Sequence, residues 1–511
     1  MTHPAGRRAA PLLFPASALL AGSAFSPAAL AAPGDIVFQD DFATQPLAID
    51  GAVPPPRWGV AIESFPRSEW RSDPGPDGQP GLMFIDGGFI ETLAPIPIDE
   101  QKFYRVSMQA NGASSQPISL NFRWQYAGTG QWETYEALIP GYAAAFSENG
   151  SARVRVVGRN TIGYLADDVV VEEATFAQAA AWGDQVLAEV PITPKTARYV
   201  RADQTIQSSL TKLQNGETVR VVMLGDSIVA DTSMSTWAAQ VSNHYPGQLE
   251  VIPTIRNGTG MEFYQGVVES EDEGLGPVGT PRLQGTVLDF DPDLVILGGV
   301  SHGFNSSAYA SVIDQLQAEG VSDIVIATEA GGYNTGQTEY LLPDWEFDID
   351  PTGDQFEAEL LALARAEGVG FADLRGTWGQ ALNDAEAEPG IFASTFHRDS
   401  VHGNHLGQEL MGLALSEFFI LPDEADANGD GAVDLLDFDA LAFSFGLIAG
   451  GTFEKGDFNG DGDVNLLDFD ILANNFDNGA PPPPAQVAIP EPASLSLLGL
   501  AGLATLRRRR G

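Results

Sequence analysis

The chain has 511 residues, of which 44% are hydrophobic, so it is long enough for two to four globular domains. Its 69 acidic and 26 basic residues give a formal net charge of −43, which argues against nucleic acid and anionic membrane surfaces as partners. The absence of cysteine excludes disulfides, cysteine nucleophiles and thiolate metal sites. Only six histidines are available as general bases.

Residues 1–31 have the pattern of a signal peptide. Arg7 and Arg8 precede an apolar, alanine-rich run, and Ala29-Leu30-Ala31 matches the small-x-small pattern of a signal-peptidase site. Prolines within the run argue against a stable membrane helix. We expect this segment to direct export and to be removed.

Residues 35–175 show the two-residue period of β-strands. Apolar and polar residues alternate over 118–125 and 153–156, and a Gly/Pro/Asp cluster at 73–78 separates such runs. This pattern predicts an antiparallel, jelly-roll-like sandwich whose first and last strands include 38–42 and 167–171. Such modules often bind carbohydrate. The candidates to stack on sugar rings are Trp58, Trp70, Trp124 and Trp132, although we favour a core position for Trp124, and a purely structural sandwich remains the alternative.

A helical linker, 176–196, is expected to lead into an α/β domain spanning 197–421. Apolar strand-like runs alternate there with amphipathic helices, which predicts a parallel sheet with crossovers. The expected strands are 221–224, 249–255, 294–297, 324–327 and 370–372; the expected helices include 177–187, 206–213, 309–316 and 356–366.

Four stretches with reactive side chains lie at predicted strand ends or before the last helix. They are Gly225-Asp226-Ser227, Arg256–Gly260, Gly298–His302 and Asp399–Gly407. Open α/β sheets bind ligands at the carboxyl ends of their strands. Together the stretches resemble the four blocks of the SGNH, or GDSL-type, hydrolases. That resemblance implies a flavodoxin-like three-layer fold and esterase or acylhydrolase activity over residues 197–421.

The resemblance implies a serine mechanism with a Ser-His-Asp triad and no catalytic cofactor. Ser227 matches the nucleophile and His402 the base, because a serine hydroxyl is a poor nucleophile until a base takes its proton. Asp399, three residues before His402, can reach the distal ring nitrogen and fix its orientation. We expect Asp226 to act as a cap, and His397 and His405 to be structural or to contact substrate.

The tetrahedral intermediate of acyl transfer needs hydrogen-bond donors aimed at its oxyanion. The family's donors match the backbone N–H groups of Ser227 and Gly260, with Gly258 as the alternative if the loop register differs. The third block departs from the family pattern, because Ser301 stands where the family usually has asparagine. Either the Ser301 hydroxyl donates instead or Asn305 supplies an amide from one helical turn further on.

Two segments, 426–437 and 457–468, repeat the same pattern of oxygen-bearing side chains and lead into apolar helices. Such side chains at loop positions 1, 3, 5, 9 and 12, glycine at position 6 and a carbonyl at position 7 are what Ca²⁺ requires. The predicted ligands are Asp426, Asn428, Asp430, Ala432, Asp434 and Asp437, then Asp457, Asn459, Asp461, Asp463, Asn465 and Asp468. The pair resembles a type I dockerin over 423–478, which implies two structural calcium ions and a cohesin-like protein partner.

The C-terminus combines a proline-rich linker, 479–488, with Ile489-Pro490-Glu491-Pro492, an apolar stretch and four arginines. Residues 489–511 resemble the PEP-CTERM sorting signal of Gram-negative bacteria that make extracellular polysaccharide. This implies a transient inner-membrane anchor, processing by a sorting protease of the exosortase kind, and a final place at the cell envelope, the outer surface or the medium.

These features together predict an exported serine esterase that acts on acylated, and we expect acetylated, polysaccharide. One alternative is a lipase, thioesterase or arylesterase of the same chemistry. The other is a surface adhesion or scaffold protein whose hydrolase domain is catalytically impaired by the changed third block.

Overall fold

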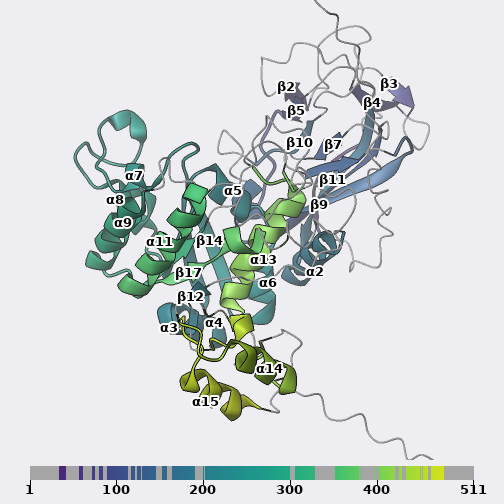
Figure 1. Cartoon of the computed structure of the whole chain (residues 1–511). Helices are drawn as coiled ribbons and strands as arrows, with labels where there is room; N and C mark the ends of the chain where they lie inside the picture. Colours follow the sequence, from purple (N-terminus) through teal and green to yellow (C-terminus); the bar gives the residue numbers. More distant parts are fainter. Residues whose placement is uncertain are drawn as a thin grey trace, which may run out of the picture. The chain divides into compact units, whose positions relative to one another are not determined.

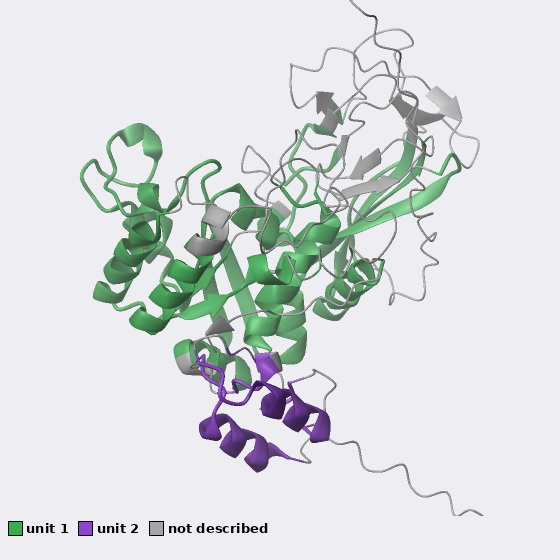
Figure 2. Ribbon diagram, viewed as in Figure 1, with its two compact units in different colours: residues 1–420 green, residues 421–511 purple. Residues whose placement is uncertain are grey.

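The computed structural model describes residues 34–41, 57–60, 72–74, 80–84, 89–112, 117–120, 124–127, 129–144, 152–157, 164–189, 199–200, 202–299, 305–328, 351–378, 381, 396–397, 402–420, 425–427, 433–448, 451, 453–458 and 462–476. The chain divides into two compact units, Met1–Ile420 and Leu421–Gly511 (Figure 2). The predicted signal peptide, proline-rich linker and sorting signal lie outside the described residues. Within the described part, no helix is both long and apolar enough to cross a bilayer.

The first part of unit 1 is built from two antiparallel sheets. One contains β3 (Ser72–Pro74), β4 (Pro80–Phe84), β11 (Tyr164–Ala174), β6 (Phe103–Asn111) and β9 (Glu133–Pro140) in that order, with β1 (Ile36–Asp40) also paired to β11. The other contains β2 (Trp58–Val60), β5 (Phe89–Thr92), β10 (Arg155–Val157), β7 (Pro117–Leu120) and β8 (Trp124–Ala127). A short helix, α1 (Gly141–Ala144), follows β9.

Alternation of side chains explains why these residues form a two-faced sheet. In β6, buried and half-buried positions alternate, with Met108 and Ala110 fully buried. The predicted first and last strands are both present and pair antiparallel as β1 and β11. The alternating stretch 118–125 is divided between β7 and β8, which form an antiparallel pair.

The second part of unit 1 is an α/β domain around a six-stranded sheet in the order β12-β17-β16-β15-β13-β14. Its five parallel strands are β13 (Thr218–Gly225), β14 (Gln248–Ile255), β15 (Leu294–Leu297), β16 (Asp323–Ala327) and β17 (Gly370–Ala372). All four residues of β15 and all five of β16 are buried, as expected for strands covered on both faces. The predicted parallel strands are therefore confirmed, whereas β12 (Tyr199–Val200), which pairs antiparallel with β17, was not predicted.

Helices cover both faces of this sheet (Figure 1). On one side α9 (Ser306–Ala318) and α11 (Pro351–Glu367) share an apolar core with the sheet, and on the other α6 (Trp237–His244) packs against α13 (His405–Phe419). The remaining helices are α2 (Phe176–Leu187), α3 (Ala202–Thr205), α4 (Gln207–Gln214), α5 (Ser227–Ser233), α7 (Met261–Tyr264), α8 (Arg282–Thr286), η1 (Glu271–Glu273) and η2 (Leu288–Phe290). The helix α2, in the predicted linker, contacts both α6 and α13.

Unit 2 contains two matched helices, α14 (Leu435–Ser444) and α15 (Leu466–Asn475), and one short helix, η4 (Phe453–Lys455). Each long helix begins with a capping box, Asp434 with Asp437 and Asn465 with Asp468. The sequence repeat therefore folds as a structural repeat, with the same side-chain-to-backbone contacts in both copies.

Candidate active site

The predicted nucleophile lies where β13 turns into α5. Asp226 is the N-cap of α5, and its Oδ1 accepts a 2.9 Å hydrogen bond from the Ile228 N–H, so Asp226 is the cap that we expected. Gly225 is required before it, because an added Cβ would lie 2.3 Å from the Gly298 carbonyl oxygen. Ser227 is thus the first residue of a helix at the carboxyl edge of a parallel sheet.

Ser227 Oγ and His402 Nε2 lie 2.9 Å apart, although 175 residues separate them in the sequence. Both side chains are half-buried, so they are held by the fold and still open to a substrate. With Nε2 unprotonated, the serine hydroxyl donates to it, and this is the geometry in which histidine can remove the hydroxyl proton. The structure therefore brings together two of the three predicted triad residues; Asp399 lies outside the described residues.

Backbone contacts of the residues that follow His402 connect this segment to residues 396 and 397. Backbone pairing joins His397 to Gly403, and the Asn404 N–H donates to the Phe396 carbonyl at 3.0 Å. The His397 ring packs against buried Trp378, with ring centroids 4.8 Å apart. His397 is thus buried against a tryptophan, and its backbone pairs with Gly403, the residue after His402. His405 is also buried, at the start of α13, with Nε2 3.9 Å from a Glu189 carboxylate oxygen.

Two backbone N–H groups are available as oxyanion donors. Neither Ser227 N–H nor Gly260 N–H donates to any acceptor among the residues that the structure describes. Ser227 begins α5, and Gly260 is the N-cap of α7, so both groups belong to helix N-termini, where the helix dipole favours negative charge. Gly258, the alternative donor, has a left-handed φ of +72° in the turn before Gly260.

Of the two candidates for the third oxyanion donor, the structure describes only Asn305. Ser301 and His302 lie outside the described residues. Asn305 is the N-cap residue of α9, and its Oδ1 accepts a 2.6 Å hydrogen bond from the Ser307 hydroxyl. The Asn305 side chain is therefore engaged at the start of its own helix through its oxygen.

Two buried tyrosines hold the glycine turns at this sheet edge, and sequence reasoning did not identify either of them. Tyr264 Oη donates to the Gly225 carbonyl at 2.6 Å, and Tyr309 Oη donates to the Gly299 carbonyl at 3.2 Å. Gly299 has φ +95°, and a Cβ there would lie 2.4 Å from Asp226 Oδ1. Tyr264 lies in the short helix α7 and Tyr309 in the predicted helix α9. The sequence alone does not distinguish a tyrosine whose hydroxyl binds a backbone carbonyl from one that only packs in the core.

Glu409 is a third residue that the sequence did not single out. It is fully buried on α13, and its carboxylate accepts hydrogen bonds from the Thr236 N–H at 3.1 Å and the Thr236 hydroxyl at 2.7 Å. Burial raises the pKa of Glu409 to about 7, against the lowering effect of these hydrogen bonds. Gly183 of α2 leaves the space it needs, because a Cβ there would lie 2.9 Å from Oε2. Glu409 on α13 therefore binds Thr236, the N-cap residue of α6, and lies against Gly183 of α2.

The described residues of the two predicted calcium loops have the chemistry that a hard cation requires. Asp426, Asp437, Asp457 and Asp468 are all buried, and every predicted ligand offers oxygen, the donor that Ca²⁺ prefers. Gly462, at loop position 6, has the left-handed φ of +86° that a sharp turn requires. Among the described residues no three carboxylate or imidazole side chains cluster as a metal site, and Asn428, Asp430, Ala432, Asn459 and Asp461 lie outside them.

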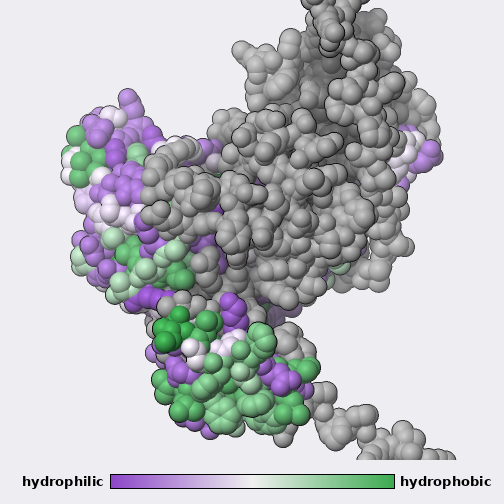
Figure 3. Space-filling view, viewed as in Figure 1, coloured by the Kyte–Doolittle hydropathy of each residue, from purple (hydrophilic) through white to green (hydrophobic). Residues whose placement is uncertain are grey.

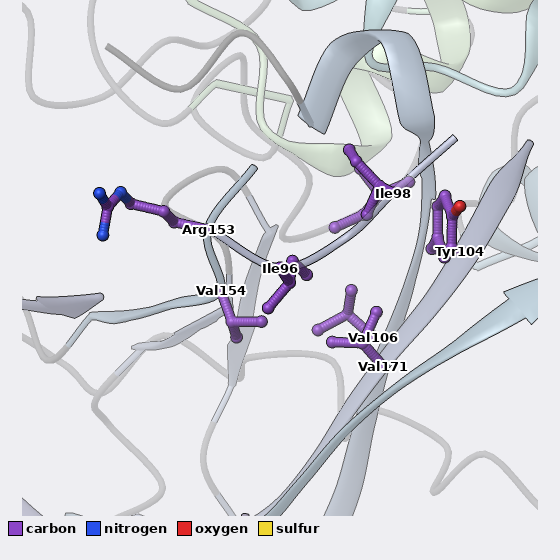
Figure 4. Close-up of a pocket in the computed structure, with 8 residues that line it drawn as sticks. Ile96, Ile98, Tyr104, Val106, Arg153, Val154 and Val171 are labelled. Atoms are coloured by element: carbon purple, nitrogen blue, oxygen red, sulfur yellow. The ribbon is translucent and has the colours of Figure 1, made fainter. Parts of the chain in front are cut away.

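The sandwich contains a cavity of about 10 Å³ lined by Ile96, Ile98, Tyr104, Val106, Ile139, Arg153, Val154 and Val171 (Figure 4). A volume of this size holds at most one water molecule. Trp58, one of the candidates for sugar stacking, is wholly buried and donates its indole N–H to Asp40 at 2.9 Å, so that expectation is wrong for Trp58. Trp132 is half-buried, and the side chains of Trp70 and Trp124 lie outside the description.

No protein-family model matches the chain, and no curated protein matches it. Solved structures with a similar arrangement include a peptidoglycan O-acetylesterase (TM-score 0.25, 12% identity, covering 69% of this chain and 75% of that chain). They also include Est24, a carbohydrate acetylesterase from Sinorhizobium meliloti (TM-score 0.25, 12% identity, 39% and 97%). A third is the CBM22-1 xylan-binding domain from Paenibacillus barcinonensis (TM-score 0.20, 13% identity, 28% and 97%). The structural neighbours of this chain thus include acetylesterases and a carbohydrate-binding β-sandwich.

Proposed function

We propose that this protein is a serine esterase that removes acyl groups, chiefly acetyl, from polysaccharide. The observation that carries the proposal is the 2.9 Å contact between Ser227 Oγ and His402 Nε2 at the carboxyl edge of the sheet. A nucleophile and base at this distance, on a helix N-terminus with unused N–H groups, are the parts that acyl transfer requires.

In the first half-reaction His402 Nε2 takes the Ser227 proton as Oγ attacks the ester carbonyl. The resulting oxyanion accepts hydrogen bonds from the N–H groups of Ser227 and Gly260. The intermediate then collapses: the bond to the sugar oxygen breaks, and the protonated His402 gives its proton to that oxygen. The products of this half are a free sugar hydroxyl and an acyl-Ser227 ester.

In the second half-reaction a water molecule attacks the acyl-Ser227 carbonyl while His402 takes its proton. Collapse of the second intermediate breaks the bond to Ser227 Oγ, which regains the proton from His402, and the carboxylic acid leaves. Asp399 would hold the distal nitrogen of His402 throughout. No step needs a metal or cofactor, so the two calcium ions that we propose for unit 2 are structural.

The substrate class rests on the architecture around the site. We propose that residues 35–175 form a module beside the esterase, that 176–196 connect them, and that 197–421 form the catalytic domain. A signal peptide at 1–31 would export the chain, and a sorting signal at 489–511, after a linker at 479–488, would be processed by exosortase-like machinery. Such an enzyme would meet polysaccharide at the cell envelope, the outer surface or in the medium.

We propose that unit 2 is a dockerin that binds a cohesin-like protein. Exposed apolar residues recur at matching places in both repeats: Leu435 and Leu466, Leu436 and Leu467, Phe438 and Phe469, Phe445 and Phe476. In Figure 3, apolar residues (green) cover much of the face that this unit presents. Exposed apolar residues gathered at matching positions are typical of a protein-binding surface, since isolated soluble domains seldom expose large apolar patches.

The test is acetate release from acetylated xylan, pectin and mannan by the full chain and by Ser227→Ala. The proposal predicts release from at least one polymer and loss of that release in the variant. A lipase or thioesterase would instead hydrolyse acyl lipids or thioesters and leave these polymers intact. A scaffold with an impaired hydrolase domain would release nothing from any ester.

A further inference from the structure

Arg256 is an exposed cation beside the nucleophile turn, and it differs from most other basic residues of unit 1. Nine of them lie within 3.9 Å of a carboxylate oxygen: Arg57, Lys102, Arg105, Arg153, Arg155, Lys212, Arg220, Arg282 and Arg375. Among the residues described in unit 1, only Arg256 and Arg365 have no such partner. Arg365 lies in the last turn of α11, where a cation complements the helix dipole.

The lack of a carboxylate at Arg256 is notable because the chain carries 69 acidic residues against 26 basic ones. In a protein with that excess, an arginine is expected to find an acidic partner unless its surroundings keep one away. Within the described part of the chain Arg256 therefore presents a positive charge with no carboxylate partner, and an anionic ligand would supply one.

The Arg256 side chain is nevertheless held in place, by an aromatic ring. Its guanidinium carbon lies 4.4 Å from the centroid of the Phe263 ring, and that of Arg282 lies 4.1 Å from the same centroid. The Phe263 ring therefore contacts both guanidinium groups. Arg282 is fixed in turn by hydrogen bonds to Glu273 at 2.7 Å and to the Phe263 carbonyl at 3.0 Å.

Stacking of this kind uses the flat face of the guanidinium and leaves its N–H edge available. The five N–H donors on that edge match a carboxylate in a two-point contact. Arg256 is thus positioned without being neutralised, which suits recognition of an anion more than a structural ion pair would.

The backbone of Arg256 lies beside the turn that leads to Ser227. Its backbone N–H donates to the Gly225 carbonyl at 2.9 Å, and Gly225 pairs with Ile255 in the sheet register. Ser227 follows Gly225 by two residues, a span of at most about 8 Å between Cα atoms. Gly260, the second proposed oxyanion donor, lies four residues after Arg256. It is the N-cap residue of α7, the helix that carries Phe263.

We propose that Arg256 binds the carboxylate of a uronic acid residue next to the acylated sugar, which makes acidic polysaccharide esters the preferred substrates. This inference rests on the proposed esterase function and narrows its substrate class. A carboxylate held in a two-point contact would place the neighbouring ester at Ser227. A neutral polymer such as xylan without uronic acid side groups would lack that contact.

The experiment compares acetate release from two substrates that differ in the charge of their carboxyl groups: an acetylated oligogalacturonate and the same oligomer with its carboxylates methyl-esterified. The ratio of their kcat/KM values is measured for the full chain, Arg256→Gln, Arg256→Lys and the matched control Arg365→Gln. We expect the wild-type protein to favour the acidic oligomer by about tenfold or more, the scale of a hydrogen bond to a charged group. Arg256→Gln should bring the ratio close to one, mainly through KM. Arg256→Lys should retain part of the preference for the acidic oligomer, and Arg365→Gln should retain all of that preference.

Outcomes that contradict the inference are separable from failure of the proposed function. A wild-type protein that hydrolyses p-nitrophenyl acetate but treats both oligomers alike overturns the inference and leaves the esterase standing. The same holds if Arg256→Gln keeps the preference, or if it affects only acetylated sulfated oligosaccharides, which would point to sulfate in place of uronate. A wild-type protein that hydrolyses no ester at all overturns the proposed function itself.

Discussion

Tyr264 Oη donates a 2.6 Å hydrogen bond to the carbonyl oxygen of Gly225 and so links the helix of one predicted oxyanion donor to the turn of the nucleophile. Tyr264 closes the short helix α7, whose N-cap is Gly260, and Gly225 directly precedes Asp226 and Ser227. The same carbonyl accepts the Arg256 N–H at 2.9 Å. The spacing between the Gly260 and Ser227 N–H groups therefore depends on contacts to a single peptide oxygen.

Tyr264→Phe should lower kcat with little change in KM, because small displacements of catalytic groups cost rate more than binding. We expect a loss of about tenfold, since displacements near 1 Å can cost up to 100-fold. Tyr245→Phe is the matched control: it removes a 2.7 Å hydrogen bond from a tyrosine to the Phe419 carbonyl, far along α13 from His402. If the two variants lose the same stability and Tyr264→Phe keeps full kcat, the linking role of Tyr264 is refuted.

Glu409 predicts a pH dependence of stability. Burial raises the pKa of this carboxyl group from 4.5 to about 7, so the folded protein keeps a proton that the unfolded chain releases above pH 4.5. The stability contributed by this group is complete below pH 4.5 and is lost as the pH rises to 7. This difference between the folded and unfolded pKa values corresponds to a decrease in the free energy of unfolding on the order of 3 kcal/mol.

The side chain of Glu409→Gln cannot ionise. Between pH 4.5 and pH 7 the free energy of unfolding of the wild-type protein should therefore fall relative to that of the variant. Urea unfolding at several pH values measures this difference directly. Glu319→Gln, an exposed change at the end of α9, should follow the wild-type curve. Parallel curves for the wild-type protein and Glu409→Gln would show that the carboxyl group does not titrate in this window.

Much of the α/β sheet could be predicted from the sequence because its strands are buried on both faces and read as continuous apolar runs. The meeting of Ser227 and His402 could also be predicted, since Gly225-Asp226-Ser227 and the segment around His402 carry their own local pattern. Tyr264, Glu409 and Arg256 could not, because their roles depend on partners brought close only by folding. Strand β12 was missed because two residues are too few to show a period.

Calcium should control the fold of unit 2. Its sequence from 423 to 477 has one basic residue, Lys455, so removal of bound cations would leave the acidic side chains to repel one another. We expect residues 423–478 to lose most far-UV helical signal in excess chelator and to regain it with Ca²⁺. Asp437→Ala and Asp468→Ala should each raise the Ca²⁺ concentration needed, whereas Asp439→Ala, outside both predicted ligand sets, should not. A spectrum that Ca²⁺ leaves unchanged would contradict the proposed calcium sites.

The central claim is that His402 activates Ser227 as a nucleophile, and covalent labelling with a fluorophosphonate followed by intact-mass and peptide analysis tests it most directly. The account predicts one adduct per chain on Ser227, a large loss of labelling rate in His402→Ala, no adduct in Ser227→Ala, and normal labelling in Ser270→Ala, which changes an exposed serine away from the site. A wild-type protein in which Ser227 stays unlabelled, or labels as fast without His402, would contradict the account.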